Sequence, residues 1–244
     1  MTPRVTGAVA ARVLVQLRRD PRTIGLIIAV PVLLIVLLHE LFRDQPQVFQ
    51  RVGGPLLGMF PFISMFVVTS VTMLRERTTG TLERLMTLPL AKLDLLLGYA
   101  AAFALMAAVQ AAVVSAVGFW LLDLHTDGPV WAVVVLAIGN ATLGMALGLF
   151  ASAFARTEFQ AVQFMPALVM PQMLLCGLFV PRGDMAAWLR AISDALPLTY
   201  AYDALAHATR GIFDGRFSAD VAVTVGGALL ALAVAAATLR RRTD

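Results

Sequence analysis

Residues 52–74 read VGGPLLGMFPFISMFVVTSVTML, and this stretch holds no Asp, Glu, Lys or Arg. A helix needs about 20 apolar residues to cross the roughly 30 Å hydrocarbon core of a bilayer. The stretch therefore predicts a membrane-spanning helix. Charged residues follow at once, beginning with Arg75, so the helix is expected to leave the membrane there.

The rest of the chain repeats this pattern. Of 244 residues, 59% are apolar and only 14% are Asp, Glu, Lys or Arg, whereas a soluble domain carries about 25% charged residues. Only helices and closed barrels span membranes, and the apolar stretches lack the alternation of barrel strands. We therefore predict one all-α, polytopic membrane domain over residues 1–244. Besides 52–74, the predicted spans are Thr23–His39, Leu95–Leu122, Gly128–Ala155, Phe159–Pro181 and Val221–Leu239, which gives six transmembrane helices.

The positions of Lys and Arg predict the orientation, because cytoplasmic loops carry an excess of both. With both termini inside, five basic residues precede the first span, four lie in the second loop, one in the fourth and three in the tail. The outer loops hold the remaining six of the nineteen. We expect a multi-pass protein of the plasma (inner) membrane with cytoplasmic termini. The net charge of +4 then reflects topology, and no nucleic acid partner is expected.

Residues 1–22 predict an amphipathic helix before the first span. Val5, Val9 and Val13 recur every four residues on one side. The polar side consists of Arg4, Arg12, Gln16 and Arg19. Such a helix lies at the inner membrane interface, with its arginines toward lipid headgroups or a cytosolic partner. The alternative is a polar leader whose arginines only set the topology.

The second loop, residues 75–92, contains RERTTGTLERLMTLP from Arg75 to Pro89. Gly80 is expected to break the helix that leaves the membrane. Glu83 suits the first turn of a new helix, where the dipole favours an anion, and Pro89 would end that helix. Its apolar face would consist of Leu82, Leu85 and Met86. The residues alone leave two interpretations open, a short cytosolic helix or an ordinary charged loop.

Several kinds of chemistry have no sequence support. The chain lacks a phosphate-binding G-x-x-x-x-G-K-[ST] loop and the H-E-x-x-H and G-x-S-x-G motifs. Its single cysteine and three separated histidines argue against disulfide and zinc sites. We expect no catalytic, cofactor or metal site. No span carries a charged residue near its middle, which argues against ion coupling. The neutral candidates for a translocation path are Gln110, Asn140, Gln163 and Gln172.

The second loop also carries a resemblance. The pattern E-x-x-x-G-T-L-E-x-L-x-x-x-P, from Glu76 to Pro89, resembles the hallmark of ABC-2 type transporter permeases, the membrane subunits of ABC exporters that include the daunorubicin-resistance type. Segments 156–164, 177–181 and 196–200 add support, so the similarity covers nearly the whole chain. It implies that the loop helix is a coupling helix that docks on a separate ATPase subunit. The coupling residues would be Gly80, Thr81, Leu82, Glu83, Leu85, Met86 and Pro89.

The resemblance has two further implications. ATP and Mg would bind the partner ATPase rather than this chain, which is therefore not expected to be an enzyme. Residues 182–220, which are too polar to span, would form short re-entrant helices at the outer face.

Spans four and five show two further patterns. Small or polar residues recur every four positions at Asn140, Gly144, Gly148 and Ser152. Such a stripe lets helices approach closely, either inside the chain or at a subunit interface. Pro166 and Pro171 predict a kink in span five, which serves either a moving substrate path or a static bend.

We interpret the chain as the permease subunit of an ATP-driven ABC exporter. The complex would hold two permease chains, identical or different, and two ATPase subunits, surrounded by membrane lipid. The uncharged spans favour a hydrophobic or amphipathic cargo, such as a drug or a lipid. The alternatives are an ion-coupled secondary transporter and a membrane scaffold without transport activity.

Overall fold

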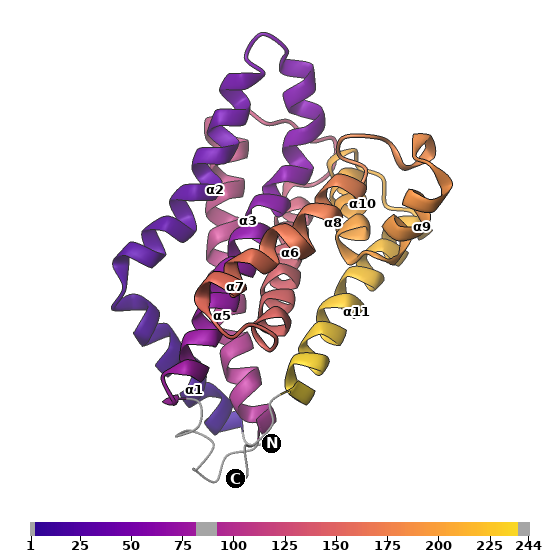
Figure 1. Cartoon of the computed structure of the whole chain (residues 1–244). Coiled ribbons are helices and arrows are strands. Elements are labelled where there is room, and N and C mark those ends of the chain that lie inside the picture. Colours follow the sequence, from indigo (N-terminus) through magenta and orange to yellow (C-terminus); the bar gives the residue numbers. More distant parts are fainter. Residues whose placement is uncertain (1–2, 82–91, 239–244) are drawn as a thin grey trace.

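The computed structural model of the chain describes residues 3–81 and 92–238, and all regular secondary structure in these ranges is helical (Figure 1). The α-helices are α1 (Pro3–Arg18), α2 (Pro21–Leu41), α3 (Pro46–Thr78), α5 (Lys92–Ala116), α6 (Val130–Ser152), α7 (Glu158–Phe164), α8 (Met170–Leu175), α9 (Ala187–Ala195), α10 (Pro197–Thr209) and α11 (Gly215–Thr238). Two π-helical turns, η1 (Val117–Leu121) and η2 (Met165–Val169), and one 3-10 turn, η3 (Arg182–Asp184), complete the described elements.

Five of the described helices are long and apolar enough to cross a membrane: Pro21–Leu41, Pro46–Thr78, Leu93–Leu121, Val130–Ser152 and Gly215–Thr238. They overlap the first four predicted spans and the last. The chain is therefore a multi-pass, all-helical membrane protein.

The predicted fifth span differs from the other five. It consists of α7, the π-helical turn η2 and α8, and helix ends at Leu175 rather than at Pro181. Pro166 lies in η2 and cannot donate to the helical ladder, so the backbone widens there. The helix stops before Gly177, whose φ of 102° suits glycine. The helix is therefore locally distorted at Pro166, and the predicted helical end at Pro181 is wrong.

The core of the bundle is the pair α3 and α6, which share the most extensive contact of any two described elements. Gly144 and Gly148 of α6 face the backbone of α3: a Cβ at Gly144 would overlap the Phe62 carbonyl, and one at Gly148 would lie 2.5 Å from the Phe66 oxygen. Two helix backbones can approach this closely only where one presents glycine. The small-residue stripe thus packs inside the chain.

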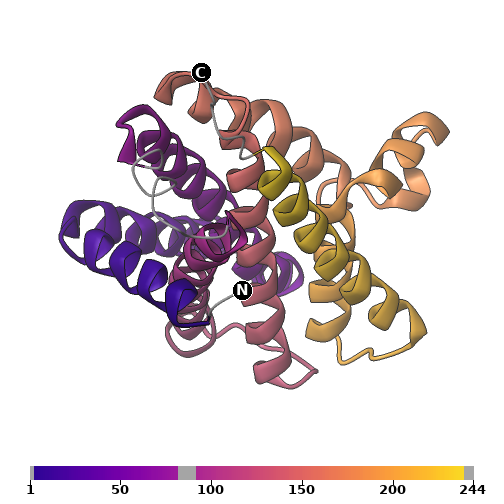
Figure 2. The same ribbon diagram turned by 90° about the horizontal axis from the view of Figure 1, so that it is seen from below.

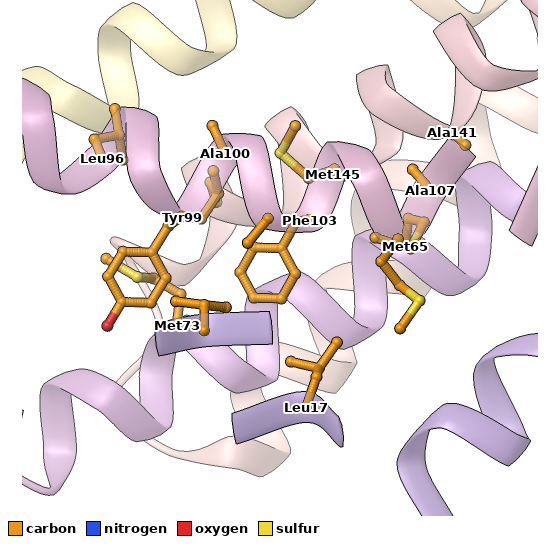
Figure 3. Close-up of a cluster of buried hydrophobic side chains, with 14 of the residues drawn as sticks. Leu17, Met65, Met73, Leu96, Tyr99, Ala100, Phe103, Ala107, Ala141 and Met145 are labelled. Carbon is orange, nitrogen blue, oxygen red and sulfur yellow. The ribbon is translucent and has the colours of Figure 1, made fainter. Parts of the chain in front are cut away.

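Helix α1 packs against α5 at one end of the bundle. Val9, Val13 and Leu17 form its buried face and join a cluster that includes Tyr99 and Phe103 of α5 (Figure 3). The predicted apolar stripe is therefore present, and α5 covers it. Figure 1 shows α1, the end of α3 at Thr78 and the end of α11 together at this end, which we call the α1 end. The view from that end shows α2 and α11 on opposite sides of the bundle (Figure 2).

Residues 182–220 contain η3, α9, α10 and the start of α11, and in Figure 1 α9 and α10 lie on the α11 side of the bundle, above the α1 end. Helix α10 is largely buried against α3, α6 and α11, and its buried residues include Leu198, Ala201 and Leu205. Helix α9 is largely exposed, with Ser193 as its buried residue. Before α11 begins, this region therefore has one helix within the bundle and one at its surface.

Candidate functional site

A partly buried ion pair joins α1 to α3 at the α1 end. The Arg12 Nη2 atom lies 3.0 Å from Glu76 Oε2 and 3.3 Å from Oε1. Arg12 Nη1 donates to the Tyr99 hydroxyl of α5 at 3.3 Å. We call Arg12, Glu76 and Tyr99 the Arg12 cluster. It connects three helices at the end of the bundle where residues 75–92 join α3 to α5.

The packing of α1 explains why Arg12 reaches inward. A Cβ at Gly98 of α5 would lie 2.6 Å from Val9 Cβ, so the two helices are close at this point. Arg12 is one residue before buried Val13, at the edge of the apolar stripe. Glu76 is only 3% exposed, and a buried carboxylate is stable only when a partner compensates its charge. Arg12 supplies that charge.

This arrangement corrects one prediction. The sequence places Arg12 on a polar face directed toward lipid or a cytosolic partner, whereas the structure directs it at Glu76. The residues are 64 positions apart, and no local pattern signals their pairing. The sequence identifies Glu76 only as the first position of the loop motif.

A second ion pair at the α1 end joins α3 to α7. Arg75 Nε and Nη2 donate to the two carboxylate oxygens of Glu158 at 2.7 and 2.9 Å. Both side chains are exposed, so the pair adds at most about 1 kcal/mol. Its effect is to hold the start of α7 beside the end of α3.

The predicted coupling residues lie only partly within the described ranges. Helix α3 ends at Thr78, and Gly80 has a φ of 72°, so the predicted helix break at Gly80 is confirmed. Thr81 follows, with its hydroxyl 3.1 Å from that of Thr79. The other predicted coupling residues, Leu82, Glu83, Leu85, Met86 and Pro89, lie outside the described residues.

The candidate path residues occupy different environments. Gln110 is buried, and its amide nitrogen donates to the Ile27 carbonyl at 2.5 Å and to the Ser64 hydroxyl, so it ties α5 to α2 and α3. Asn140 is buried beside Gly58 of α3, and its amide atoms have no partner among the described residues. These two side chains lie inside the bundle rather than on an open surface.

The other two candidates belong to α7 and α8. Gln172 is buried; it donates to the Leu168 carbonyl at 2.9 Å and accepts from the Leu198 amide at 3.4 Å, which joins α8 to α10. Gln163 is exposed on α7. The four residues therefore do not form one polar surface. Within residues 3–81 and 92–238, no group of three or more His, Cys, Asp and Glu side chains gathers where a metal ion could bind.

Comparison with known proteins identifies related chains. A family model described as "ABC-2 type transporter" matches residues 4–209. The probable multidrug ABC transporter permease YbhR of Escherichia coli K12 is 29% identical over 150 residues, 61% of this chain and 40% of YbhR. The linearmycin resistance permease protein LnrN of Bacillus subtilis 168 is 25% identical over 162 residues, 66% of this chain and 41% of LnrN. ABC transporter G family member 20 of Dictyostelium discoideum is 24% identical over 147 residues, 60% of this chain and 20% of that protein. The matches thus cover less than half the length of each relative.

Proposed function

Because this chain belongs to the ABC-2 type transporter family, we propose that it is the membrane-spanning permease subunit of an ATP-driven ABC exporter. Its cargo is a hydrophobic or amphipathic small molecule, either a drug or a lipid. YbhR is named as a probable multidrug permease and LnrN as a linearmycin resistance permease, which supports this class of cargo. The observation that carries the proposal is the Arg12 cluster, which joins three helices where the proposed coupling loop begins.

The proposed complex contains two permease chains and two ATPase subunits, and ATP and Mg bind the ATPases. Closure of the ATPase pair pushes on residues 75–92. Arg12 bonds Glu76, one residue after the start of that segment, and Tyr99 of α5. A force on the loop therefore reaches α1, α3 and α5 together. This supports α1 and the coupling loop acting as one unit.

In the proposed membrane placement both termini are cytoplasmic and the α1 end faces the cytoplasm of the plasma (inner) membrane. The oblique segment α7–η2–α8 supplies a sixth crossing. Helix α1 lies at the inner interface, and α9 and α10 form the outer re-entrant region. The bias of thirteen basic residues to six supports this orientation.

The translocation path is proposed to run between the two permease chains along α7–η2–α8. This segment exposes large apolar side chains: Phe159, Val162, Leu168, Met170 and Leu174. A face of this kind contacts lipid or a second chain. Gln163 lies on the same exposed segment and is the candidate polar contact for cargo.

The ion-coupled alternative finds less support. In the helices described as candidate membrane spans, the buried acidic residues are Glu76, Asp94 and Asp220. All three lie near helix ends, and Glu76 and Asp220 face Arg12 and His207. Driving-ion sites typically need an acid well inside the membrane. A scaffold without transport activity would not need the coupling motif.

The energy source is the first testable prediction. The purified chain should hydrolyse no ATP, because it has no phosphate-binding loop. In vesicles with its partner ATPase, ATP should drive drug or lipid transport even when an ionophore collapses the proton gradient. The measurement is transport rate with ATP, with a non-hydrolysable ATP analogue, and with a proton gradient alone. Full transport by this chain alone on a proton gradient would overturn the exporter proposal.

Glu83 provides the second prediction. If its carboxylate only complements a helix dipole, Glu83→Gln loses about 0.3–1 kcal/mol and transport barely changes. If it docks in a groove of the ATPase, the loss of binding is about 2–5 kcal/mol. We expect the docking result: normal membrane insertion, but much less ATPase in pull-downs and little substrate-stimulated hydrolysis.

The control for Glu83→Gln is Glu40→Gln, since Glu40 is exposed near the end of α2 and far along the chain from residues 75–92. Glu76 is unsuitable as a control, because its substitution would unpair Arg12. Normal complex assembly and normal transport in Glu83→Gln would remove this residue from the coupling site.

A further inference from the structure

Two cavities follow one another along α11, beside α10. The first, which we call the outer basin, has a volume of about 490 Å³. It is charged, and its lining includes Arg51, Arg182, Asp203, His207, Arg210 and Arg216. The second, the α11 groove, has a volume of about 570 Å³ and lies between α6, α11 and the turn from α9 to α10. Its lining is mainly apolar and includes Leu147, Phe150, Pro197, Val223, Leu230 and Val234.

The outer basin has an excess of positive charge. The charge of Arg182 is compensated by two ion pairs, one with Asp203 at 2.7 Å and one with Asp194 at 3.1 Å. The remaining arginines, Arg51, Arg210 and Arg216, form no ion pair within residues 3–81 and 92–238. They come from α3, from the end of α10 and from the start of α11. Three guanidinium groups around one cavity suit a phosphate group, which arginine binds through paired hydrogen bonds.

Asp203 does not cancel this excess. Burial raises the pKa of the Asp203 carboxyl, and Arg182 acts in the opposite direction. Its closest cation is Arg182, so it leaves the three unpaired arginines available. His207 faces Asp220 at 3.6 Å on the opposite helix. Asp203 and Asp194 thus pair with Arg182, Asp220 lies beside His207, and the exposed arginines remain for a ligand.

One face of α11 lines both cavities. Arg216, Ala219 and Asp220 line the outer basin. The residues that line the α11 groove continue at spacings of three and four: Val223, Gly226, Gly227, Leu230, Ala231 and Val234. At 1.5 Å per residue, the part from Val223 to Val234 is roughly 16 Å long. The face is therefore charged at its outer end and apolar along the part inside the membrane.

Exposed apolar side chains adjoin the lining residues of the basin in the sequence. Phe179 and Val180 precede Pro181, which lines the basin, while Ile212 and Phe213 follow Arg210, and all four side chains are exposed. A site for a free, hydrated anion would need neither exposed apolar neighbours nor an adjoining apolar groove. An amphiphile at a membrane surface needs both.

We propose that the outer basin and the α11 groove together bind an anionic phospholipid of the outer leaflet, with its phosphate among Arg51, Arg210 and Arg216 and an acyl chain along α11. The proposal relies on the orientation given above, but binding requires neither ATP nor a partner ATPase. A chain that failed to transport could still bind this lipid, so the two proposals fail separately.

The test measures binding of phosphatidylglycerol to the purified full chain in detergent by native mass spectrometry. The first variant, Arg210→Gln with Arg216→Gln, removes two of the arginines proposed to bind the phosphate headgroup. Each charge-assisted hydrogen bond that is lost should weaken lipid binding about tenfold. The second variant, Gly226→Leu, alters the groove proposed to hold the acyl chain. No atom lies within 4 Å of a Cβ at Gly226, so leucine fills the groove without a clash at its Cβ. It should weaken binding about tenfold or more while thermal unfolding stays unchanged.

Matched controls separate this site from general charge and hydrophobicity. Arg43→Gln removes an exposed arginine that lies outside both cavities. Gly139→Leu adds the same side chain at an exposed α6 glycine with no atom within 4 Å. Neither should change binding. Equal losses in variants and controls would overturn the proposal. Glycerol phosphate or inorganic phosphate binding as tightly as the lipid would assign the basin to a soluble anion instead.

Discussion

Arg12→Met should lower the free energy of unfolding by about 3 kcal/mol. Methionine keeps the apolar stem of Arg12 and leaves the Glu76 carboxylate buried without its cation. Breaking a buried pair typically costs about 3–5 kcal/mol. Because 33% of the Arg12 side chain is exposed, water reaches the ion pair. We therefore expect a loss of stability at the lower end of this range. The midpoint of thermal unfolding in detergent should fall by about 6–12 °C for a chain of this size.

The double variant Arg12→Met with Glu76→Leu serves as the control, since it removes both charges and fills the site with apolar atoms. Replacing a whole buried pair in this way is often neutral, so most of the lost stability should return. If the double variant is as unstable as the single one, the unpaired charge is not the cause. The contact of Arg12 with Tyr99 would then carry the stability.

Both variants also test the proposed coupling. In Arg12→Met, α1 keeps its apolar contact with α5 but loses its bond to α3. The double variant should therefore regain stability without regaining ATP-driven transport. Transport at the original rate in the double variant would mean that coupling does not pass through this pair.

The sequence predicts the membrane helices well because their signal is local. A run such as 52–74 without charge must be buried in lipid or protein, and length then identifies a span. The Arg12 pairing could not be predicted, because an arginine that sets topology and one that compensates a buried acid look the same in sequence. Three-dimensional packing of α1 on α5 distinguishes them.

The fifth predicted span shows a different limit. Pro166 predicts a disturbance of the helix, and the structure contains the π-helical turn η2 at that position. Hydrophobicity continues to Val180, so composition extends the span past Leu175. The end of the helix is instead set by backbone geometry at Gly177, whose positive φ is not visible in an apolar pattern.

The candidate path residues show why polarity alone does not define a site. Gln110 and Gln172 are polar residues in apolar helices, and both use their amides to bond neighbouring helices. Buried polar side chains usually serve this purpose. Gln163 differs only in being exposed, and a sequence pattern without a known packing partner does not predict exposure.

Gly144→Val should destabilise the chain by about 3 kcal/mol, the upper end of the cost of adding carbons to a packed core. The added Cβ would meet the Phe62 carbonyl of α3, and a helix backbone yields less easily than a flexible side chain. Gly139→Val is the matched control on the same helix, because Gly139 is exposed with open space around it. It should be neutral or gain a few tenths of a kcal/mol from better helix propensity.

Thermal unfolding and size-exclusion chromatography of both variants separate two explanations. If the glycine stripe served a subunit interface, Gly144→Val would dissociate the oligomer and leave the stability of each protomer unchanged. Because the stripe packs on α3, we expect the unfolding midpoint to fall by about 6–12 °C even in the isolated protomer.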